Sequence, residues 1–219
     1  MDIIDPKLQE YAESLSTPED ELLKKVSAFT QRHSESHMMS GHLQGKVLEM
    51  VSCMIRPRRV LEIGTFTGYS ALCLAKGLTE EGELHTIELR DFEAEKAKEF
   101  FLQSEQAGRI ILHTGNALSI IPELNETWDL VFIDAYKPDY IEYFNLVFPK
   151  VRKNGFILAD NIFFHGQALP AHAGTDGEKE PKGINAKGII AFNEFIKNNK
   201  KVEKVVLTVR DGLYLMKKL

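Results

Sequence analysis

Oxygen-bearing side chains follow two apolar runs in the second half of the chain. Asp134 comes directly after Leu130–Ile133, and Asp160 with Asn161 comes directly after Phe156–Ala159. If both runs are strands of a parallel sheet, their carboxyl ends lie at one edge, where open α/β sheets bind ligands. Two carboxylates and an amide oxygen suit a hard octahedral cation. An Asp-Asn pair more often only caps a turn, but the matching position of Asp134 favours a site for Mg²⁺, Mn²⁺ or Ca²⁺.

A second pattern, earlier in the chain, predicts a nucleoside ligand. Gly64 and Gly68 lie between an apolar run and a helical pattern that begins near Ser70. Glycines there let the backbone approach a ligand closely at the start of a helix. Glu88 follows 20 residues after Gly68 (88 − 68), at the end of the next run, where a carboxylate accepts hydrogen bonds from ribose hydroxyls. The combination predicts an adenosine-type ligand. Its G-x-x-x-G spacing disfavours a nicotinamide-dependent oxidoreductase, which needs G-x-G-x-x-G.

The elements that must position these side chains form an alternation of apolar runs and helical patterns from about residue 57. The runs predicted as strands are Val60–Ile63, Glu83–Ile87, Ile110–His113, Leu130–Ile133, Phe156–Ala159 and Val202–Thr208. Apolar runs linked by helices indicate a parallel sheet covered on both faces. Near the C-terminus, Val205–Val209 and Leu213–Lys217 flank an Asp-Gly pair, which signals a hairpin. The last strand is therefore expected to be antiparallel.

The whole chain, 1–219, is interpreted as a single α/β domain. Helical periodicity up to about residue 56 predicts N-terminal helices as an appendage over 1–56. The remainder, 57–219, is predicted to be a Rossmann-like, doubly wound, mostly parallel seven-stranded sheet. One stretch, about 164–188, is rich in glycine and proline. A loop of that length inside a compact domain is usually functional or disordered, and its place after a strand end favours a lid.

Composition narrows the classes of partner. With 27 Lys+Arg, 32 Asp+Glu and a formal net charge of −5, the chain has no dense basic block, which argues against nucleic acid as a partner. No run of about 18 apolar residues and no signal-peptide pattern is present, so a cytoplasmic protein outside the membrane is expected. Cys53 and Cys73 lie in apolar, helix-like surroundings and are expected to be buried, reduced thiols.

Taken together, these motifs resemble the metal-dependent class I S-adenosylmethionine (SAM) O-methyltransferases of the catechol and caffeoyl-CoA type. The resemblance covers nearly the whole chain, including the expected N-terminal helices and closing hairpin. The segments that carry it are Met38–Ser40 with Gln44-Gly45, Glu62–Ser70, Glu88, Gly115–Ala117, Asp134–Lys137 and Asp160-Asn161. Several ordered motifs at the family's spacing are far more specific than one glycine-containing loop.

The resemblance implies a role for each matching residue. Those implied to bind the cofactor are Met38, Ser40, Glu62, Gly64, Thr65 and Ser70 along its methionine part, Glu88 at the ribose, Ala117 beside the adenine, and Asp134. Asp134, Asp160 and Asn161 would hold the divalent cation, for which Mg²⁺ is the first choice. Lys137, assisted by Asp134, stands where catechol-type enzymes place the group that accepts the substrate hydroxyl proton. The family also implies a homodimer, with the N-terminal helices at its interface.

The implied substrate is a small molecule with an aromatic hydroxyl. His165 occupies the position of a substrate-contacting asparagine in the plant enzymes, so a substrate contact is expected there, but the change argues against their acyl-CoA substrate. Lys137 would take up the phenolic proton if the cation and partial burial lower its pKa. Catechols, caffeoyl esters, flavonoids and other vicinal diols on rings all stay open as acceptors. The alternatives are a methyltransferase that acts on a macromolecule, an oxidoreductase and an inactive SAM-binding module.

Overall fold

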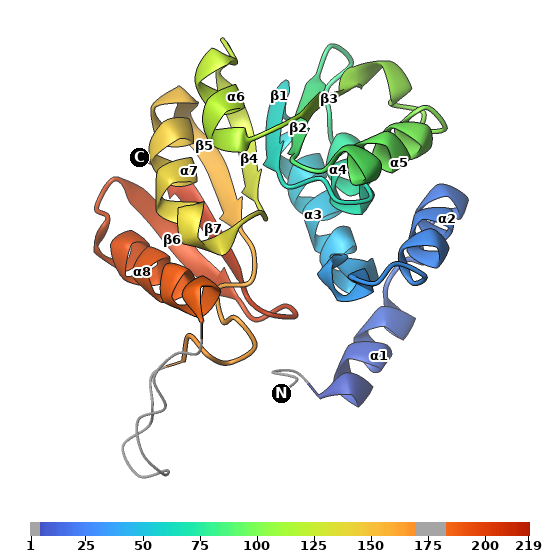
Figure 1. Cartoon of the computed structure of the whole chain (residues 1–219), viewed down its shortest axis with the longest axis horizontal. Coiled ribbons are helices and arrows are strands. Elements are labelled where there is room, and N and C mark those ends of the chain that lie inside the picture. The colour runs from blue at the N-terminus through green and yellow to red at the C-terminus, as the bar shows by residue number, and fades with distance from the viewer. Residues whose placement is uncertain (1–4, 170–182) are drawn as a thin grey trace.

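A seven-stranded sheet forms the centre of the molecule (Figure 1). The computed structural model describes residues 5–169 and 183–219. The spatial order of the strands is β3-β2-β1-β4-β5-β7-β6. Their bounds are β1 Arg59–Ile63, β2 Glu83–Glu88, β3 Ile110–Thr114, β4 Trp128–Ile133, β5 Val151–Ala159, β6 Val202–Leu207 and β7 Leu213–Lys218. Each predicted strand is present, and the Rossmann-like architecture is confirmed.

Strands β1 to β5 pair in parallel, and their side chains supply the core on both faces of the sheet. Successive side chains of a strand point to opposite faces. On β1, Val60 therefore packs on one side, while Leu61 and Ile63 pack on the other. All three are fully buried. This two-sided burial is why the strands are uniformly apolar in the sequence.

Helices cover both faces of the sheet. Helices α6, α7 and α8 pack on one face, and α3, α4 and α5 with α2 pack on the other (Figure 1). Their bounds are α1 Pro6–Leu15, α2 Glu21–Thr30, α3 Gly41–Ile55, α4 Tyr69–Ala75, α5 Asp91–Phe101, α6 Ala117–Glu123, α7 Tyr140–Val147 and α8 Ile184–Asn198. Short 3₁₀ helices occupy Ser36–Met38, Ala107–Arg109, Lys137–Asp139 and Phe148–Lys150. The predicted N-terminal helices are thus present as α1, α2 and α3.

The C-terminal hairpin adds the antiparallel element predicted from its Asp-Gly turn. Strand β7 pairs antiparallel with both β5 and β6, so it lies between them. Strand β6 consequently forms the edge of the sheet and runs in the direction of the parallel strands. The hairpin brings its turn, around Arg210, next to the carboxyl ends of β4 and β5.

Two predictions about individual segments need correction. The lid-like loop was placed at 164–188, but α8 already begins at Ile184, and Gly188 is part of that helix. Apolar residues at helical spacing, including Ile189 and Phe192, bury one side of α8, which outweighs the glycine. Residues 170–182 of that loop lie outside the described residues. Cys53 is exposed, because it lies on the outer side of α3, whereas Cys73 is buried as expected.

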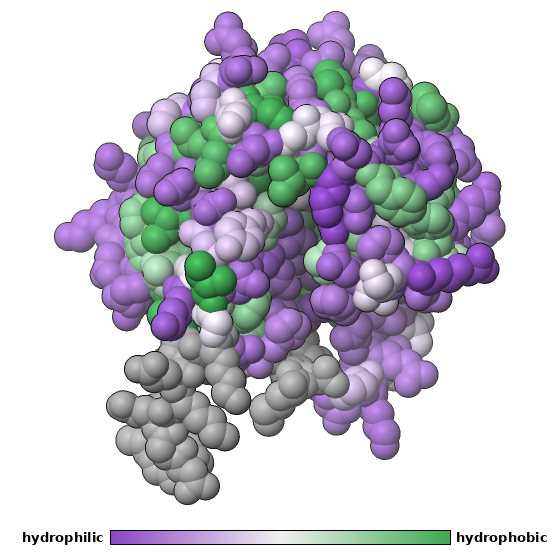
Figure 2. Space-filling view, viewed as in Figure 1, coloured by the Kyte–Doolittle hydropathy of each residue, from purple (hydrophilic) through white to green (hydrophobic). Residues whose placement is uncertain are grey.

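The surface visible in Figure 2 is mostly hydrophilic, with smaller apolar areas between the polar side chains. Among the described helices, none combines the length and the apolar character needed to cross a membrane. Apolar side chains distributed in this way are normal for the surface of a folded domain.

Candidate functional site

The candidate site lies where four parallel strands end at the same level. Ile63 of β1 is aligned with Ile87 of β2 and with Ile133 of β4. Hydrogen bonds continue this alignment beyond the strands, because the Asp134 amide donates to the Ile63 carbonyl at 2.9 Å and the Asp160 amide donates to the Ile133 carbonyl at 3.0 Å. The residues that follow β1, β4 and β5 are therefore held side by side.

Gly64 is the point at which two of these strand ends approach most closely. Its φ of 98° lies in the left-handed region, and a Cβ atom there would lie 1.9 Å from the carbonyl oxygen of Asp134. Only glycine fits without moving this backbone. The first glycine of the sequence motif is thus required to bring β1 and β4 together at the site.

A cavity of about 780 Å³ opens above these strand ends. It is lined by most of the residues predicted to form the site: Met38, Ser40, Gly64, Thr65, Ser70, Glu88, Ala117, Asp134, Lys137, Asp160, Asn161 and His165. Residues that are more than 100 positions apart in the chain meet there. The structure therefore brings together the predicted nucleoside, cation and proton-accepting groups, and their individual roles stay predictions.

Lys137 is held by two partners at the floor of the cavity. Its Nζ donates to Oδ1 of Asp134 and to the hydroxyl of Tyr140, each at 2.8 Å. Burial by itself lowers the pKa of Lys137, but the negative charges of Asp134 and Asp160 outweigh it and leave the pKa raised. This differs from the lowered pKa expected from partial burial, because that expectation did not include two carboxylates beside the amine.

Asp160 is a carboxylate in a place that disfavours its charge. It is buried, and burial together with the nearby charge of Asp134 raises its pKa. Its Oδ2 accepts a hydrogen bond from Gln44 at 2.7 Å, and its Oδ1 accepts one from the Asn161 amide at 2.7 Å. Two crowded carboxylates, of which one is fully desolvated, are stabilised by a cation placed between them. Together with the side-chain amide oxygen of Asn161, these two carboxylates form a set of oxygen ligands that fits a hard divalent ion.

Glu88 organises the opposite side of the cavity. Its Oε2 accepts the Phe66 amide hydrogen at 2.7 Å, and its Oε1 accepts hydrogen bonds from the backbone and side chain of Arg90. Arg90 in turn donates to Glu35 at 2.6 Å and lies over the Phe66 ring. The carboxylate is thus fixed by the loop that follows β1, with its position set for a polar ligand.

Comparison with known proteins decides the family. Residues 13–219 match the family model described as O-methyltransferase. The chain belongs to the O-methyltransferase family. It is 32% identical to the O-methyltransferase ankF of Aspergillus thermomutatus, over 96% of this chain and 92% of that protein. It is 29% identical to a catechol O-methyltransferase of Niastella koreensis, over 88% of this chain and 85% of the relative.

Solved structures agree with this assignment. The O-methyltransferase TomG of Streptomyces achromogenes, involved in tomaymycin synthesis and solved in complex with SAM, superposes with a TM-score of 0.84 at 31% identity. The match covers 97% of this chain and 96% of TomG. The SAH-bound methyltransferase PaMTH1 of Podospora anserina gives a TM-score of 0.86 at 26% identity, over 97% of this chain and 94% of the other. This O-methyltransferase is therefore an enzyme of the family indicated by its motifs.

Among the residues predicted to bind the cofactor, Glu62 is not part of the cavity lining. Glu62 is fully buried behind the strand ends, and Thr86 donates a hydrogen bond to its Oε2. Burial raises the pKa of Glu62 to about 8, and its Oε1 has no hydrogen-bond partner among the described residues. Ser70, which lines the cavity, is among the groups that hydrogen-bond Glu62, so Glu62 lies next to the cavity lining and its cofactor contact stays a prediction.

Other residues of the methyltransferase site were not predicted. Tyr140 accepts the bond from Lys137, and Arg210 donates to the backbone carbonyls of Met39 and Ser40. Asp211, which follows Arg210, is half-buried and accepts the His165 amide hydrogen at 2.7 Å. The spacing of three between Lys137 and Tyr140 is the only signal in the sequence for the first contact. The contacts of Arg210 join segments about 170 residues apart, so no local pattern reveals them.

Proposed function

We propose that this O-methyltransferase moves a methyl group from SAM to a hydroxyl of a catechol-like or caffeoyl-type small molecule, assisted by a divalent cation. The observation that carries the proposal is the meeting of Asp134, Asp160 and Lys137 in one cavity with Gly64 and Glu88. TomG, solved with SAM, and the catechol O-methyltransferase of Niastella koreensis support the same cofactor and acceptor class.

The charged residues of the cavity indicate which side would bind SAM and which side would bind the methyl acceptor. Glu88, fixed by the loop after β1, is suited to accept hydrogen bonds from the ribose hydroxyls of SAM. Gly64 leaves room for the methionine part at the strand end, and Ala117 lies beside the expected adenine position. The acceptor is expected on the Lys137 side, next to His165. The proposal thus places the methyl group between the glycine loop and the two aspartates.

Asp134, Asp160 and Asn161 would hold the cation, preferably Mg²⁺. When bound, a divalent cation supplies positive charge that compensates the two carboxylates and stabilises an ionised hydroxyl of the acceptor. Lys137 is buried, so its ammonium form depends on the negative charge of Asp134 and Asp160. Once that charge is compensated, the neutral amine form of Lys137 becomes accessible, and that form is suited to take up the acceptor's proton and so to return to the ammonium form. Orientation of the acceptor oxygen in line with the methyl group supplies much of the remaining rate.

A methyl-transfer assay tests the reaction. Labelled SAM is offered with catechols, caffeic acid and caffeoyl-CoA, each with Mg²⁺ and with a chelator. We expect labelled product from at least one vicinal diol and its loss in chelator. Product formation that is insensitive to the chelator would contradict the role of the cation, and failure to bind SAM would contradict the cofactor assignment.

The first prediction separates cation binding from cofactor binding. Asp160→Ala is expected to abolish metal-stimulated turnover and to leave SAM affinity nearly unchanged, because Asp160 lies on the far side of the cavity floor from Glu88. Asp160→Asn keeps the side-chain shape and the Gln44 contact and should give the same loss of turnover in a folded protein. Glu194→Gln, an exposed carboxylate on α8, is the matched control. Collapse of SAM binding, measured by calorimetry, would show that these roles are assigned wrongly.

A further inference from the structure

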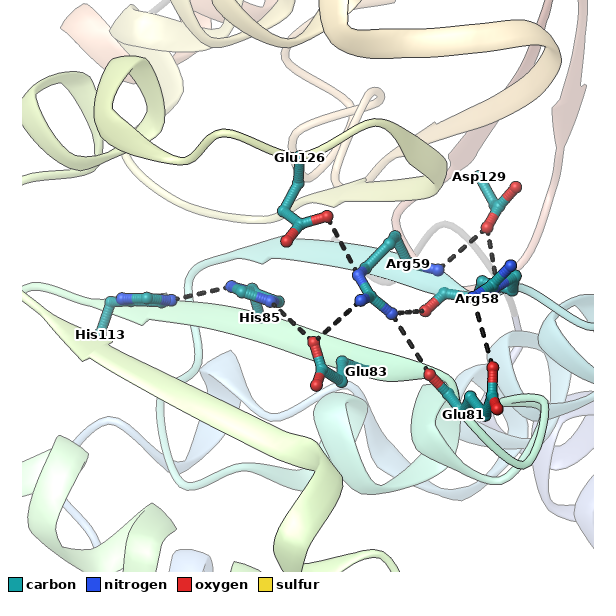
Figure 3. Close-up of polar contacts among 8 residues, drawn as sticks. All are labelled: Arg58, Arg59, Glu81, Glu83, His85, His113, Glu126 and Asp129. Carbon is teal, nitrogen blue, oxygen red and sulfur yellow. Dashed lines mark hydrogen bonds and ion pairs between the residues drawn. The ribbon is translucent and has the colours of Figure 1, made fainter.

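A second group of chemically active side chains lies at the end of the sheet opposite the cavity (Figure 3). Glu83 and His85 belong to β2, where alternate residues share one face. Glu126 belongs to the segment that precedes β4. One possible ligand atom from each of the three residues lies within 4.8 Å of those of the other two. None of these residues contributes to the proposed methyl-transfer site.

His85 is the member of this group that is buried with an unpaired ring nitrogen. Its residue is 7% exposed, and its Nε2 has no hydrogen-bond partner among the described residues. That nitrogen points toward Glu83, whose Oε2 lies 3.8 Å away, beyond hydrogen-bond distance (Figure 3). The other ring nitrogen, Nδ1, lies 3.1 Å from Nε2 of His113. The Trp128 ring covers the edge of the imidazole.

Neither tautomer of His85 satisfies both of its nitrogens. If Nδ1–H donates to His113, the lone pair of Nε2 faces the carboxylate of Glu83. If His113 donates instead, the Nε2–H of His85 lies 3.8 Å from Oε2 of Glu83, which is too long for a hydrogen bond unless Glu83 moves closer. A cation at Nε2 pairs the buried nitrogen in the first of these tautomers.

Arg59 is the cation that now balances the two glutamates. Its Nε lies 3.0 Å from Glu126 and its Nη2 lies 3.4 Å from Glu83. The same guanidinium also donates to the backbone carbonyls of Arg58 and Glu81, so it retains partners if it leaves the carboxylates (Figure 3). These hydrogen bonds of Arg59 go to Glu126, Arg58 and Glu81, so none of them pairs the Nε2 of His85, which has no partner among the described residues.

We propose that Glu83, His85 and Glu126 form a binding site for a divalent transition-metal ion, Zn²⁺ above all, which displaces the guanidinium of Arg59. One imidazole and two carboxylates form a donor set that zinc accepts, with water in the fourth position. The Nδ1–H of His85, donated to His113, fixes the tautomer in which Nε2 faces the metal. Ligand atoms around tetrahedral zinc lie about 3.4 Å apart, so the partly exposed glutamates must close in by about 1 Å.

The proposed ion joins β2 to the segment before β4, far from the cavity. Its expected effect is therefore on stability. Nitrogen ligation distinguishes it from the hard-cation site at Asp134 and Asp160, because imidazole favours zinc, nickel and copper over magnesium. The side chains of Glu83 and Glu126 are partly exposed, so an ion reaches the site from solvent without unfolding of the sheet.

Zinc binding by the full chain tests the proposal. After removal of metals with a chelator, Zn²⁺ is titrated calorimetrically in excess Mg²⁺, so that the hard-cation site is already filled. We expect one Zn²⁺ per chain and a rise in the thermal midpoint on binding. Titration with Co²⁺ should give visible absorption bands typical of low-coordinate nitrogen and oxygen ligation. An Asp160→Asn background should bind Zn²⁺ equally well.

Variants locate the ion. His85→Gln and Glu126→Gln are each expected to weaken Zn²⁺ binding by at least about tenfold, whereas His42→Gln on α3 is the matched control and should not. Arg59→Gln should bind Zn²⁺ more tightly than the unmodified chain, because the competing cation is gone. Circular dichroism checks that each variant is folded, and Glu126→Gln, outside the sheet, keeps the test valid if His85→Gln unfolds. Absent binding by the unmodified chain, unchanged affinity in Glu126→Gln, or weaker binding in Arg59→Gln would overturn the proposal.

Discussion

At the scale of single residues, charge decides what Lys137 can do. The amine lies between Asp134 and Tyr140, and the negative charge around it raises its pKa although burial alone would lower it. A lysine in this state is an ammonium ion that holds the cavity floor together. In the proposed mechanism it acts as a base only where the carboxylates are compensated, which ties its activity to the occupancy of the proposed cation site.

Replacement of Lys137 tests that dependence. Lys137→Met is expected to lower kcat by about 10²- to 10⁴-fold, the usual contribution of a positioned acid or base. SAM affinity should change little, because Lys137 lies on the acceptor side of the cavity. Steady-state kinetics and calorimetry measure the two effects, and Lys187→Met on the exposed side of α8 is the control. Turnover that survives in Lys137→Met would show that another group takes the proton.

Glu62 gives a prediction about stability and pH. Burial raises its pKa from 4.5 to about 8, so the folded chain holds a proton that the unfolded chain releases between these values. The stability that Glu62 contributes is therefore present at low pH and is lost as the pH rises toward 8. Between pH 5.5 and 8 the unmodified chain should lose roughly 3 kcal/mol more free energy of unfolding than Glu62→Gln. Urea denaturation at both pH values measures the difference, and parallel curves would refute it.

At the scale of elements, the turn between β6 and β7 supports the cofactor side of the site. Arg210 lies in that turn with a φ of 48° and donates to the carbonyls of Met39 and Ser40. These contacts fix the segment before α3 against the carboxyl end of the sheet. The C-terminal hairpin therefore holds in place the part of the cavity wall that Met39 and Ser40, from the N-terminal part of the chain, provide.

Removal of this contact should loosen that wall. Arg210→Met is expected to weaken SAM binding by about 1.5 to 3 kcal/mol, the range for hydrogen bonds made by charged groups. The effect should appear mainly in KM for SAM, with kcat less affected, because Arg210 does not contact the aspartates of the cation site. Arg32→Met, an exposed arginine after α2, serves as the control. Equal KM values for SAM in both variants would show that Arg210 has no such positioning role.

At the scale of the whole molecule, apolar side chains are exposed on the N-terminal helices. On α1, Leu8, Tyr11 and Leu15 are exposed, and on α3, Met50 and Met54 are exposed. Helices α1 and α3 also contact each other. An exposed apolar region of this kind is typical of an interface between subunits. It supports the homodimer that we propose from the family resemblance.

A charge placed in this region should separate the subunits. Leu15 is 72% exposed, as is Met54, so Leu15→Glu and Met54→Glu cost the folded monomer little. We expect light scattering to give twice the chain mass for the unmodified protein and the single chain mass for the double variant. Leu219→Glu, at the exposed C-terminus, is the matched control. A monomer in the unmodified protein at micromolar concentration would contradict the dimer.

The sequence by itself determined the elements and the groups that meet at their ends. Uniformly apolar runs predicted the strands because both faces of a parallel sheet are buried. The residues at the carboxyl ends of β1, β2, β4 and β5 marked the site because parallel strands end at one edge. Gly64 was informative for the same reason, since close approach of two strand ends excludes a side chain. Each of these signals lies within a short segment of the chain, so the amino-acid sequence alone is enough to detect it.

Tertiary structure alone decided the contacts between distant segments. It placed β7 between β5 and β6, brought Gln44 to Asp160 and Arg210 to Ser40, and buried Glu62 completely. It also set the charge of Lys137, because a pKa depends on every group packed around the amine. Local periodicity carries no information about such pairs. They follow from how the helices and the hairpin pack on the finished sheet, where burial and long-range hydrogen bonds are decided together.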